Sequence, residues 1–443
     1  MKMKGLLKET IKKMPVMKNF FQKNAEMQEK IQWLMEKNQI LSNEKIDLRL
    51  KIKKMEHKKI TVVFVCHRPS VWESLRSVYE ELAEDDSFFV HIVAIPNKKE
   101  LPDVGFFHEE YESEGAEEFW KKYECINGYD YTTREWFDIR SLKPDYVFFQ
   151  QPYNITRGPL YKSWVVSEYA KICYVAYANN FIGGGILEET SPKDFMQNVF
   201  EYYTQNEIDD QLVRNVLDKD GNHFTRTKIT GFPRYDNLEQ YEGCVSSTWK
   251  TASQDNFFRV LWTPRWCVNE GTCSFFEYKD KLVDFFSENR DFEFVFRPHP
   301  QAFLNWNRTG EFPEKKARDY LRKYQMSENM SVDQKAEYFK TIFSSDCLIS
   351  DMSSFIADYF MTGKPVVYCH KKDMFNELSR KMSEGFYWIR SWKELKETLV
   401  MLQSGEDPLR EKRMELLREL NMRPENGSAA KKIKARILED AGK

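Results

Sequence analysis

The sequence lacks the cysteine spacing that disulfide frameworks and structural zinc sites require. Its eight cysteines are scattered, with no CxxC pair and no regular interval. Small secreted domains and zinc modules depend on such intervals, so we expect neither disulfides nor a bound metal. Scattered cysteines of this kind are typical of reduced thiols in the cytosol.

Long apolar runs are also missing. A helix that crosses a bilayer needs roughly 18 or more consecutive apolar residues, and no stretch approaches that length. The amino-terminal residues do not have the pattern of a secretory signal. We therefore predict a cytoplasmic protein.

Charge is distributed unevenly along the chain. The 443 residues carry a formal net charge of −2, but residues 1–59 hold about 16 basic and 7 acidic side chains, which leaves the remainder at about −11. Residues 78–124 hold about 14 acidic and 4 basic side chains, a balance that would repel a phosphate backbone. Nucleic acid is therefore not an expected partner.

The first 23 residues form a basic leader in which leucine and phenylalanine are interspersed. One interpretation is a solvated extension of the chain. The other is attachment to an anionic membrane surface, which requires both positive charge and buried apolar groups. The second interpretation predicts peripheral association with the inner face of the cell membrane.

The next segment has the spacing of a coiled-coil seam. Residues of the seam recur at alternating intervals of four and three: Met27, Ile31, Leu34, Asn38, Leu41, Lys45, Leu48, Ile52 and Met55. Polar residues such as Asn38 and Lys45 within a seam specify register at a cost in stability. The pattern predicts a homo-oligomer formed through this helix, although a helix packed on its own domain would give a similar pattern.

The pattern changes after residue 58. Apolar runs at 60–66, 88–96, 144–150 and 171–178 alternate with helical periodicity, and the same alternation restarts at 256–264, 292–300, 347–351 and 364–370. Such alternation is typical of parallel, doubly wound α/β sheets, and 443 residues are too many for one ordinary core. We predict an extension over residues 1–57, an α/β domain over 58–232 and a second α/β domain over 233–443.

Polar turns follow the predicted strands of the second domain. Thr263 and Arg265 follow the first strand, and Arg297 and His299 follow the next, between prolines that stiffen the turn. Ligands in doubly wound sheets bind outside the carboxyl ends of the strands, where these turns lie. The turns therefore predict a site for an anionic ligand.

A third turn, "ISDMSSFIAD", adds Ser353, Ser354 and Asp358. The serines can cap a helix start that attracts phosphate, and the carboxylate can accept hydrogen bonds from ribose hydroxyls. Each of these residues also has an ordinary structural interpretation, as a helix cap, a surface ion pair or a solvated side chain. Their combination favours a nucleotide diphosphate.

At these residues the sequence resembles the CDP-glycerol glycerophosphotransferase family, which includes teichoic acid polymerases. The resemblance rests on "FRPHP" and "LISDMSSFIADYFMTGKPVVY", on "TGFPRYD" with Arg234, and on "WTPRW" with Thr263 and Arg265. It implies a GT-B architecture with the active site between two Rossmann-like domains. It also implies metal-independent transfer from a CDP-activated alditol phosphate, with no cofactor.

The resemblance implies roles for single residues. His299, with Arg297, is expected to contact the donor diphosphate. Ser353 and Ser354 are expected to contact phosphate, and Asp358 to lie near the ribose.

The first domain departs from the family pattern. The "WHGTPLK"-like turn, whose histidine is the candidate base, is absent, and "QPYNITRGPLY" follows the corresponding strand. Glutamine cannot act as a base. His67, at the end of the first strand, is the best substitute because a histidine titrates near neutral pH, although a structural role in its loop is an equal alternative.

The leading hypothesis is a transferase that moves glycerol phosphate or ribitol phosphate from a CDP-activated donor to a hydroxyl of a lipid-linked or polymeric acceptor, releasing CMP. The first alternative is a GT-B glycosyltransferase that uses a nucleotide sugar in capsule or surface polysaccharide synthesis. The second is a non-catalytic assembly protein, which would bind no nucleotide.

Overall fold

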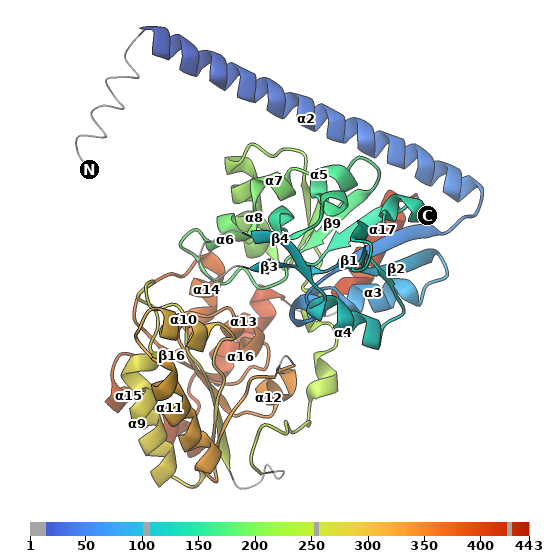
Figure 1. Ribbon diagram of the computed structural model, residues 1–443. Coiled ribbons are helices and arrows are strands. Elements are labelled where there is room, and N and C mark those ends of the chain that lie inside the picture. Colours follow the sequence, from blue (N-terminus) through green and yellow to red (C-terminus); the bar gives the residue numbers. More distant parts are fainter. Residues whose placement is uncertain (1–14, 101–106, 252–256, 336, 423–427, 443) are drawn as a thin grey trace.

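The computed structural model describes residues 15–100, 107–251, 257–335, 337–422 and 428–442. Two α/β domains lie one below the other, and the long helix α2 (Pro15–Met55) runs along the side of the first domain away from the second (Figure 1). The predicted leader falls largely outside the described residues.

The first domain contains a parallel seven-stranded sheet. Its strands, in sheet order, are β11 (Arg226–Ile229), β10 (Val199–Thr204), β9 (Lys171–Val175), β8 (Tyr146–Phe149), β1 (Ile60–Cys66), β2 (Phe88–Ala94) and β5 (Cys125–Asn127). All seven residues of β1 are buried, as expected for a parallel strand with both faces covered. The order reverses between β8 and β1, which gives the sheet a topological switch point.

The second domain repeats this arrangement with six parallel strands. In sheet order these are β14 (Met330–Val332), β13 (Phe292–Phe296), β12 (Phe258–Thr263), β15 (Cys347–Ser350), β16 (Val366–Cys369) and β17 (Tyr387–Ile389). Its switch point lies between β12 and β15, where two of the predicted polar turns begin. The prediction of two doubly wound sheets is confirmed.

Helices cover both sheets. In the first domain they are α3 (Arg76–Ala83), α4 (Glu114–Lys122), α5 (Ser163–Val166), α6 (Ile186–Thr190), α7 (Lys193–Met196) and α8 (Glu207–Lys219). In the second they are α9 (Phe275–Glu288), α10 (Ala302–Arg308), α11 (Glu314–Met326), α12 (Phe339–Phe343), α13 (Phe355–Phe360), α14 (Glu377–Met382), α15 (Trp392–Gln403) and α16 (Arg410–Leu420).

Two outer strand pairs complete the first domain. One joins β3 (Asn97–Glu100) to β4 (Phe107–Glu112), and the other joins β6 (Tyr129–Asp130) to β7 (Glu135–Trp136); both are antiparallel.

The last helix returns to the first domain. Helix α17 (Ala429–Asp440) packs against α3, and its Lys434 forms an ion pair with Glu81. Asp440 accepts a hydrogen bond from Tyr146 at 2.7 Å and pairs with Lys171 at 2.5 Å. The predicted division at 232/233 separates the two sheets, but it assigns to the second domain a helix that packs on the first.

The domains also touch through a loop that follows β9. The backbone N–H of Gly183 donates to the Met374 carbonyl at 2.7 Å, and Asn376 Nδ2 donates to the Asn180 carbonyl at 2.6 Å. A Cβ on Gly183 would lie 2.9 Å from the Asn376 nitrogen, so the close approach requires glycine there. These contacts fix one side of the space between the domains.

Among the described residues, no helix has both the length and the apolar character needed to cross a bilayer.

Candidate functional site

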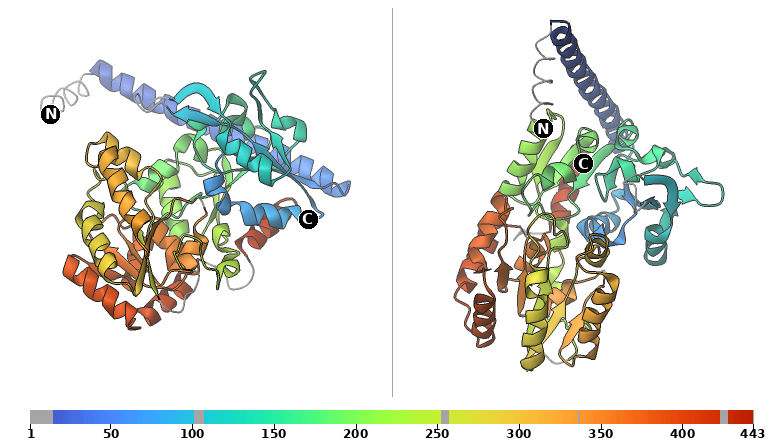
Figure 2. Two further views of the ribbon diagram at one scale, coloured as in Figure 1. Left: turned by 60° about the horizontal axis from the view of Figure 1, so that its bottom comes forward. Right: turned by 60° about the vertical axis from the view of Figure 1, so that its left-hand side comes forward.

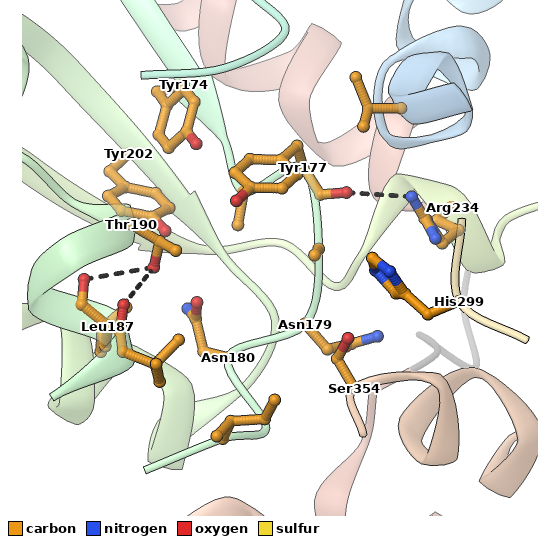
Figure 3. Close-up of a pocket in the computed structure, with 15 residues that line it drawn as sticks. Tyr174, Tyr177, Asn179, Asn180, Leu187, Thr190, Tyr202, Arg234, His299 and Ser354 are labelled. Atoms are coloured by element: carbon orange, nitrogen blue, oxygen red, sulfur yellow. Dashed lines mark hydrogen bonds between the residues drawn. The ribbon is translucent and has the colours of Figure 1, made fainter. Parts of the chain in front are cut away.

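A cavity of about 310 Å³ lies between the two domains (Figure 3). This volume is within the range of small-molecule sites. The second domain contributes His299 and Ser354, and the segment that joins the domains contributes Arg234. The first domain contributes Val71, Tyr174, Ala176, Tyr177, Ala178, Asn179, Asn180, Ile182, Ile186, Leu187, Thr190 and Tyr202.

His299 faces this cavity from the turn after β13. Its ring stacks on Trp266 with centroids 5.6 Å apart, and its Nδ1 accepts the backbone N–H of Gln301 at 3.2 Å. Partial enclosure, together with the positive charges of Arg265 and Arg297, lowers the pKa of His299 to about 4. The imidazole is therefore neutral at pH 7, and the bond to Nδ1 leaves the proton on Nε2, which can donate to an anionic ligand.

Arg234 offers a hydrogen-bond donor to the cavity. Its guanidinium is buried and donates to the Tyr177 carbonyl at 3.0 Å and to Tyr338 Oη at 2.6 Å. Its Nε has no hydrogen-bond partner among the described residues. A buried donor without a partner is costly, so this N–H is available to a ligand that enters the cavity.

Asp358 is enclosed by donors from both domains. Its carboxylate accepts hydrogen bonds from Arg234 at 3.1 Å, Tyr235 at 2.9 Å, Tyr338 at 2.5 Å and Asn179 at 3.0 Å. Asp358 is 4% exposed and does not line the cavity. Asp358, which was predicted to lie near the ribose, therefore belongs to a buried network that joins the two domains and orients Arg234.

The two serines of the turn after β15, Ser353 and Ser354, have different surroundings. Ser354, which precedes α13, lines the cavity and makes no side-chain capping bond. Ser353 Oγ instead accepts the Phe355 N–H at 3.3 Å, and Ser353 does not line the cavity. Only Ser354 of the predicted pair is placed to contact a ligand in this cavity.

The three remaining residues predicted to bind the donor, Thr263, Arg265 and Arg297, bond to other side chains instead. Thr263 donates to Ser350 Oγ at 2.9 Å within the buried switch point of the second sheet. Arg265 makes a bidentate pair with Glu270, at 2.8 Å for each bond. These residues brace the turns, and neither lines the cavity.

Arg297 is also paired, with Asp333 at 2.7 Å, and its guanidinium lies over the ring of Tyr338 with 4.9 Å to the centroid. It does not line the cavity. Its charge reaches the site through its effect on the pKa of His299.

His67 is placed differently from His299. It is 2% exposed, does not line the cavity, and its Nε2 lies 3.1 Å from Gln151 Oε1. Burial, with the nearby charges of Arg157 and Arg68, lowers the pKa of His67 to about 3. This enclosed, neutral imidazole does not have the position that the predicted general base requires.

The glutamine turn after β8 is internally bonded. Gln150 Oε1 accepts the backbone N–H groups of His67 at 2.6 Å and Arg68 at 2.8 Å. Arg157 is 1% exposed and donates to the Gln151 carbonyl and the Asn154 side chain, each at 2.8 Å. These polar groups support the loop itself.

The sequence interpretation missed the wall that the first domain contributes. Tyr177, Asn179 and Asn180 follow β9, and Asn179 Oδ1 has no partner among the described residues. The signal was present in "YANNFIGGG", where amides and glycines follow a strand end. That composition is typical of a loop that approaches a ligand or another chain segment.

No group of three or more metal-ligating side chains lies close together in the described part of the chain.

The sequence pattern of one protein family extends over residues 191–439, which is more than half of the chain. The chain belongs to the CDP-glycerol:poly(glycerophosphate) glycerophosphotransferase family. The predicted family resemblance is therefore confirmed, and with it the assignment as an enzyme. Among curated proteins, none matches the chain.

Solved structures show the same fold at low sequence identity. A UDP-N-acetylglucosamine 2-epimerase is 13% identical, with a TM-score of 0.57 over 87% of this chain and 97% of its own. The UDP-GlcNAc 2-epimerase from Neisseria meningitidis, solved with UDP-GlcNAc, is 15% identical, with a TM-score of 0.56 over 86% and 100%.

The wall teichoic acid polymerase TagF is 14% identical, with a TM-score of 0.50 over 91% of this chain and 98% of its own. At such identities the likeness shows the fold alone. It confirms a GT-B-like arrangement of the two sheets for this member of the glycerophosphotransferase family.

Proposed function

We propose that this enzyme transfers an alditol phosphate, glycerol phosphate or ribitol phosphate, from a CDP-activated donor to an acceptor hydroxyl. The observation that carries the proposal is the convergence of His299, Ser354 and Arg234 on one cavity of about 310 Å³ between the domains. All three can donate hydrogen bonds, and one is a cation. A diphosphate is the ligand class that such a group of donors suits.

In the proposed reaction the acceptor oxygen attacks the β-phosphorus of the donor. The bond from that phosphorus to the bridging oxygen breaks, CMP leaves with the bond's electrons, and the proton of the acceptor hydroxyl passes to solvent water. The Nε2–H of His299 and the guanidinium of Arg234 stabilise charge on the phosphate oxygens. Preorganised donors of this kind lower the barrier most when they are aimed at developing charge.

The wall from the first domain faces the acceptor in this proposal. Its lining residues include tyrosines and amides but no carboxylate, lysine or histidine. Such a wall binds a polyol or sugar through ring contacts and neutral hydrogen bonds. This wall offers no general base for the acceptor hydroxyl. His67 does not line the cavity and so cannot contact an acceptor there directly.

We further propose that the acceptor is lipid-linked or part of a cell-surface polymer, with the enzyme held at the inner membrane face by its basic leader. Removal of residues 1–25 is expected to reduce sedimentation with anionic vesicles and to leave activity on soluble acceptors unchanged. Equal sedimentation of both proteins would refute the membrane attachment.

Donor identity is tested with a thermal-shift panel of CDP-glycerol, CDP-ribitol, UDP-sugars and CMP-sugars. We expect stabilisation by a CDP-alditol and release of CMP when acceptor is added. A shift with UDP-sugars alone would instead favour the glycosyltransferase alternative, and no shift with any of these nucleotides would refute the proposed donor.

His299→Ala tests the site. We expect the variant to keep its fold, by circular dichroism, and to lose CMP release. His223→Ala is the matched control, since His223 is exposed and lies outside the cavity. Unchanged turnover in His299→Ala would overturn the assignment.

A further inference from the structure

Helix α2 carries two stripes of heptad-spaced residues, and the structure uses only one of them. The first, here called the docked stripe, consists of Gln39, Asn43, Ile46, Leu50 and Lys53. The second, here called the open stripe, consists of the nine seam residues from Met27 to Met55. Both stripes follow the alternating intervals of four and three that place side chains on one face of a helix.

The docked stripe holds the helix against the first domain. Ile46 and Leu50 are 1% and 2% exposed. Lys53 pairs with the buried Asp145 at 2.6 Å, and the neighbouring Arg49 pairs with the same carboxylate at 2.9 Å. This face is therefore fully used within one chain.

The open stripe lies on the other side of the helix. Ile46 and Leu48, one from each stripe, are two residues apart, which separates them by about 200° around the helix axis. The apolar members of the open stripe are between 43% and 81% exposed: Met27, Ile31, Leu34, Leu41, Leu48, Ile52 and Met55. Asn38 and Lys45 are exposed as well.

The amino-terminal half of α2 stands clear of both domains (Figure 2). No residue between 21 and 38 is buried, and the structure describes all of them. Helices draw most of their stability from packing an amphipathic face, and monomers rarely expose long apolar patches. A helical segment of this length with an exposed apolar seam is therefore incomplete in a single chain.

We propose that the open stripe binds the open stripe of a second copy of this chain, as a parallel, in-register two-stranded coiled coil. Asn38 occupies heptad position a of the open stripe. A single Asn at this position favours a parallel, in-register dimer, because it then faces the same Asn of the second copy. Lys45, at the next a position, then reaches Glu44 of the second copy, and Lys51 faces Glu56 of the second copy, a pair of opposite sign. The docked stripe keeps each first domain on the outside of the pair.

This inference goes beyond the transferase activity and does not depend on it. Helix α2 lies on the side of the first domain away from the second domain, so pairing through α2 leaves the cavity between the domains of each copy accessible (Figure 1).

The test compares two double substitutions in the full-length protein, with mass measured by light scattering after size exclusion. The wild type is expected near 106 kDa, twice the chain mass of 53.0 kDa. Leu34→Glu with Leu41→Glu changes two open-stripe residues and is expected to give a monomer. Trp33→Glu with Ile40→Glu introduces the same charges beside the stripe, at residues 55% and 40% exposed, and is expected to stay dimeric.

Register is tested by oxidation of Asn38→Cys, which should form a covalent dimer, whereas Ile40→Cys should not. A monomeric wild type, or loss of the dimer in both double variants, would overturn the proposal. So would crosslinking only in a mixture of Asn38→Cys and Leu41→Cys chains, which would indicate antiparallel helices. Dimers that form only when anionic vesicles are added would show that the open stripe binds lipid instead.

Discussion

The two walls of the cavity differ in chemistry. The second domain and the joining segment present His299, Ser354 and Arg234, which are donors suited to an anion. The first domain presents rings, amides and aliphatic side chains. In the proposed reaction, the two walls distinguish the two substrates by chemistry: the phosphates of the donor bind on the charged side, and the neutral hydroxyl-bearing acceptor binds on the other.

The walls are joined by one buried carboxylate. Asp358 bonds to Asn179 from the first domain, to Tyr338 from the second, and to Arg234 and Tyr235 from the segment between them. This network holds the charged wall at a fixed position relative to the neutral one.

Removal of that carboxylate is expected to have the largest effect. Asp358→Ala leaves the buried Arg234 cation without its counter-charge, and breaking a buried pair in this way costs about 3–5 kcal/mol. We expect this loss in the free energy of unfolding by urea titration, together with loss of donor binding.

Asp284→Ala removes an exposed carboxylate from α9 and serves as the control, with an expected change within about 0.5 kcal/mol. A loss below about 1 kcal/mol in Asp358→Ala would show that the network does not join the walls.

The pH dependence of stability tests the enclosure of His67. The pKa of His67 is lowered to about 3, so the folded protein binds fewer protons than the unfolded chain below about pH 6.5. Stability is therefore expected to fall as pH falls through this window, by about 2–3 kcal/mol between pH 6.5 and 4.5.

His67→Gln removes this titration and should flatten the curve of unfolding free energy against pH. An unchanged slope would mean that His67 is not enclosed as the structure shows.

Two residues of the charged wall, His299 and Ser354, could be proposed from the sequence because backbone topology places them, whereas Arg234 came from the family motif "TGFPRYD". His299 and Ser354 follow apolar strands beside the switch point of a doubly wound sheet, and that rule applies without knowledge of side-chain partners. Arg265 and Arg297 obey the same rule, yet Glu270 and Asp333 engage them. A pattern of strand ends cannot show which cations are already paired.

The neutral wall was missed for a related reason. Tyrosines and amides carry no charge signal, and their sequence resembles that of an ordinary strand and loop. Asp358 illustrates the same limit, since its four donors come from three separate parts of the chain. The coiled-coil spacing, by contrast, was visible at once, but only the structure separates the docked stripe from the open one.

A change in the neutral wall is expected to affect the acceptor alone. Tyr177→Ala removes a ring that lines the cavity but keeps the backbone carbonyl that binds Arg234. Loss of a ring contact is worth about 1.4 kcal/mol, so kcat/KM for acceptor should fall about tenfold while the thermal shift with donor is unchanged.

Tyr177→Phe keeps the ring and loses only the hydroxyl that bonds to Tyr153, and it should retain most of the activity. Equal loss of donor and acceptor binding in Tyr177→Ala would contradict the separation of the two walls.

The smallest expected effect is a change in the pKa of one histidine, His299, when CMP binds. Phosphate charge beside an imidazole favours its protonated form, so CMP should raise the pKa of His299 from about 4. The pKa of His67, which lies outside the cavity, should not move. The measurement is a histidine titration by NMR, assigned with the His299→Ala and His67→Gln variants. Because both histidines start well below the ordinary pKa of 6.5, a shift at His299 alone locates the phosphate on the charged wall, and a shift at His67 would place it in the first domain instead.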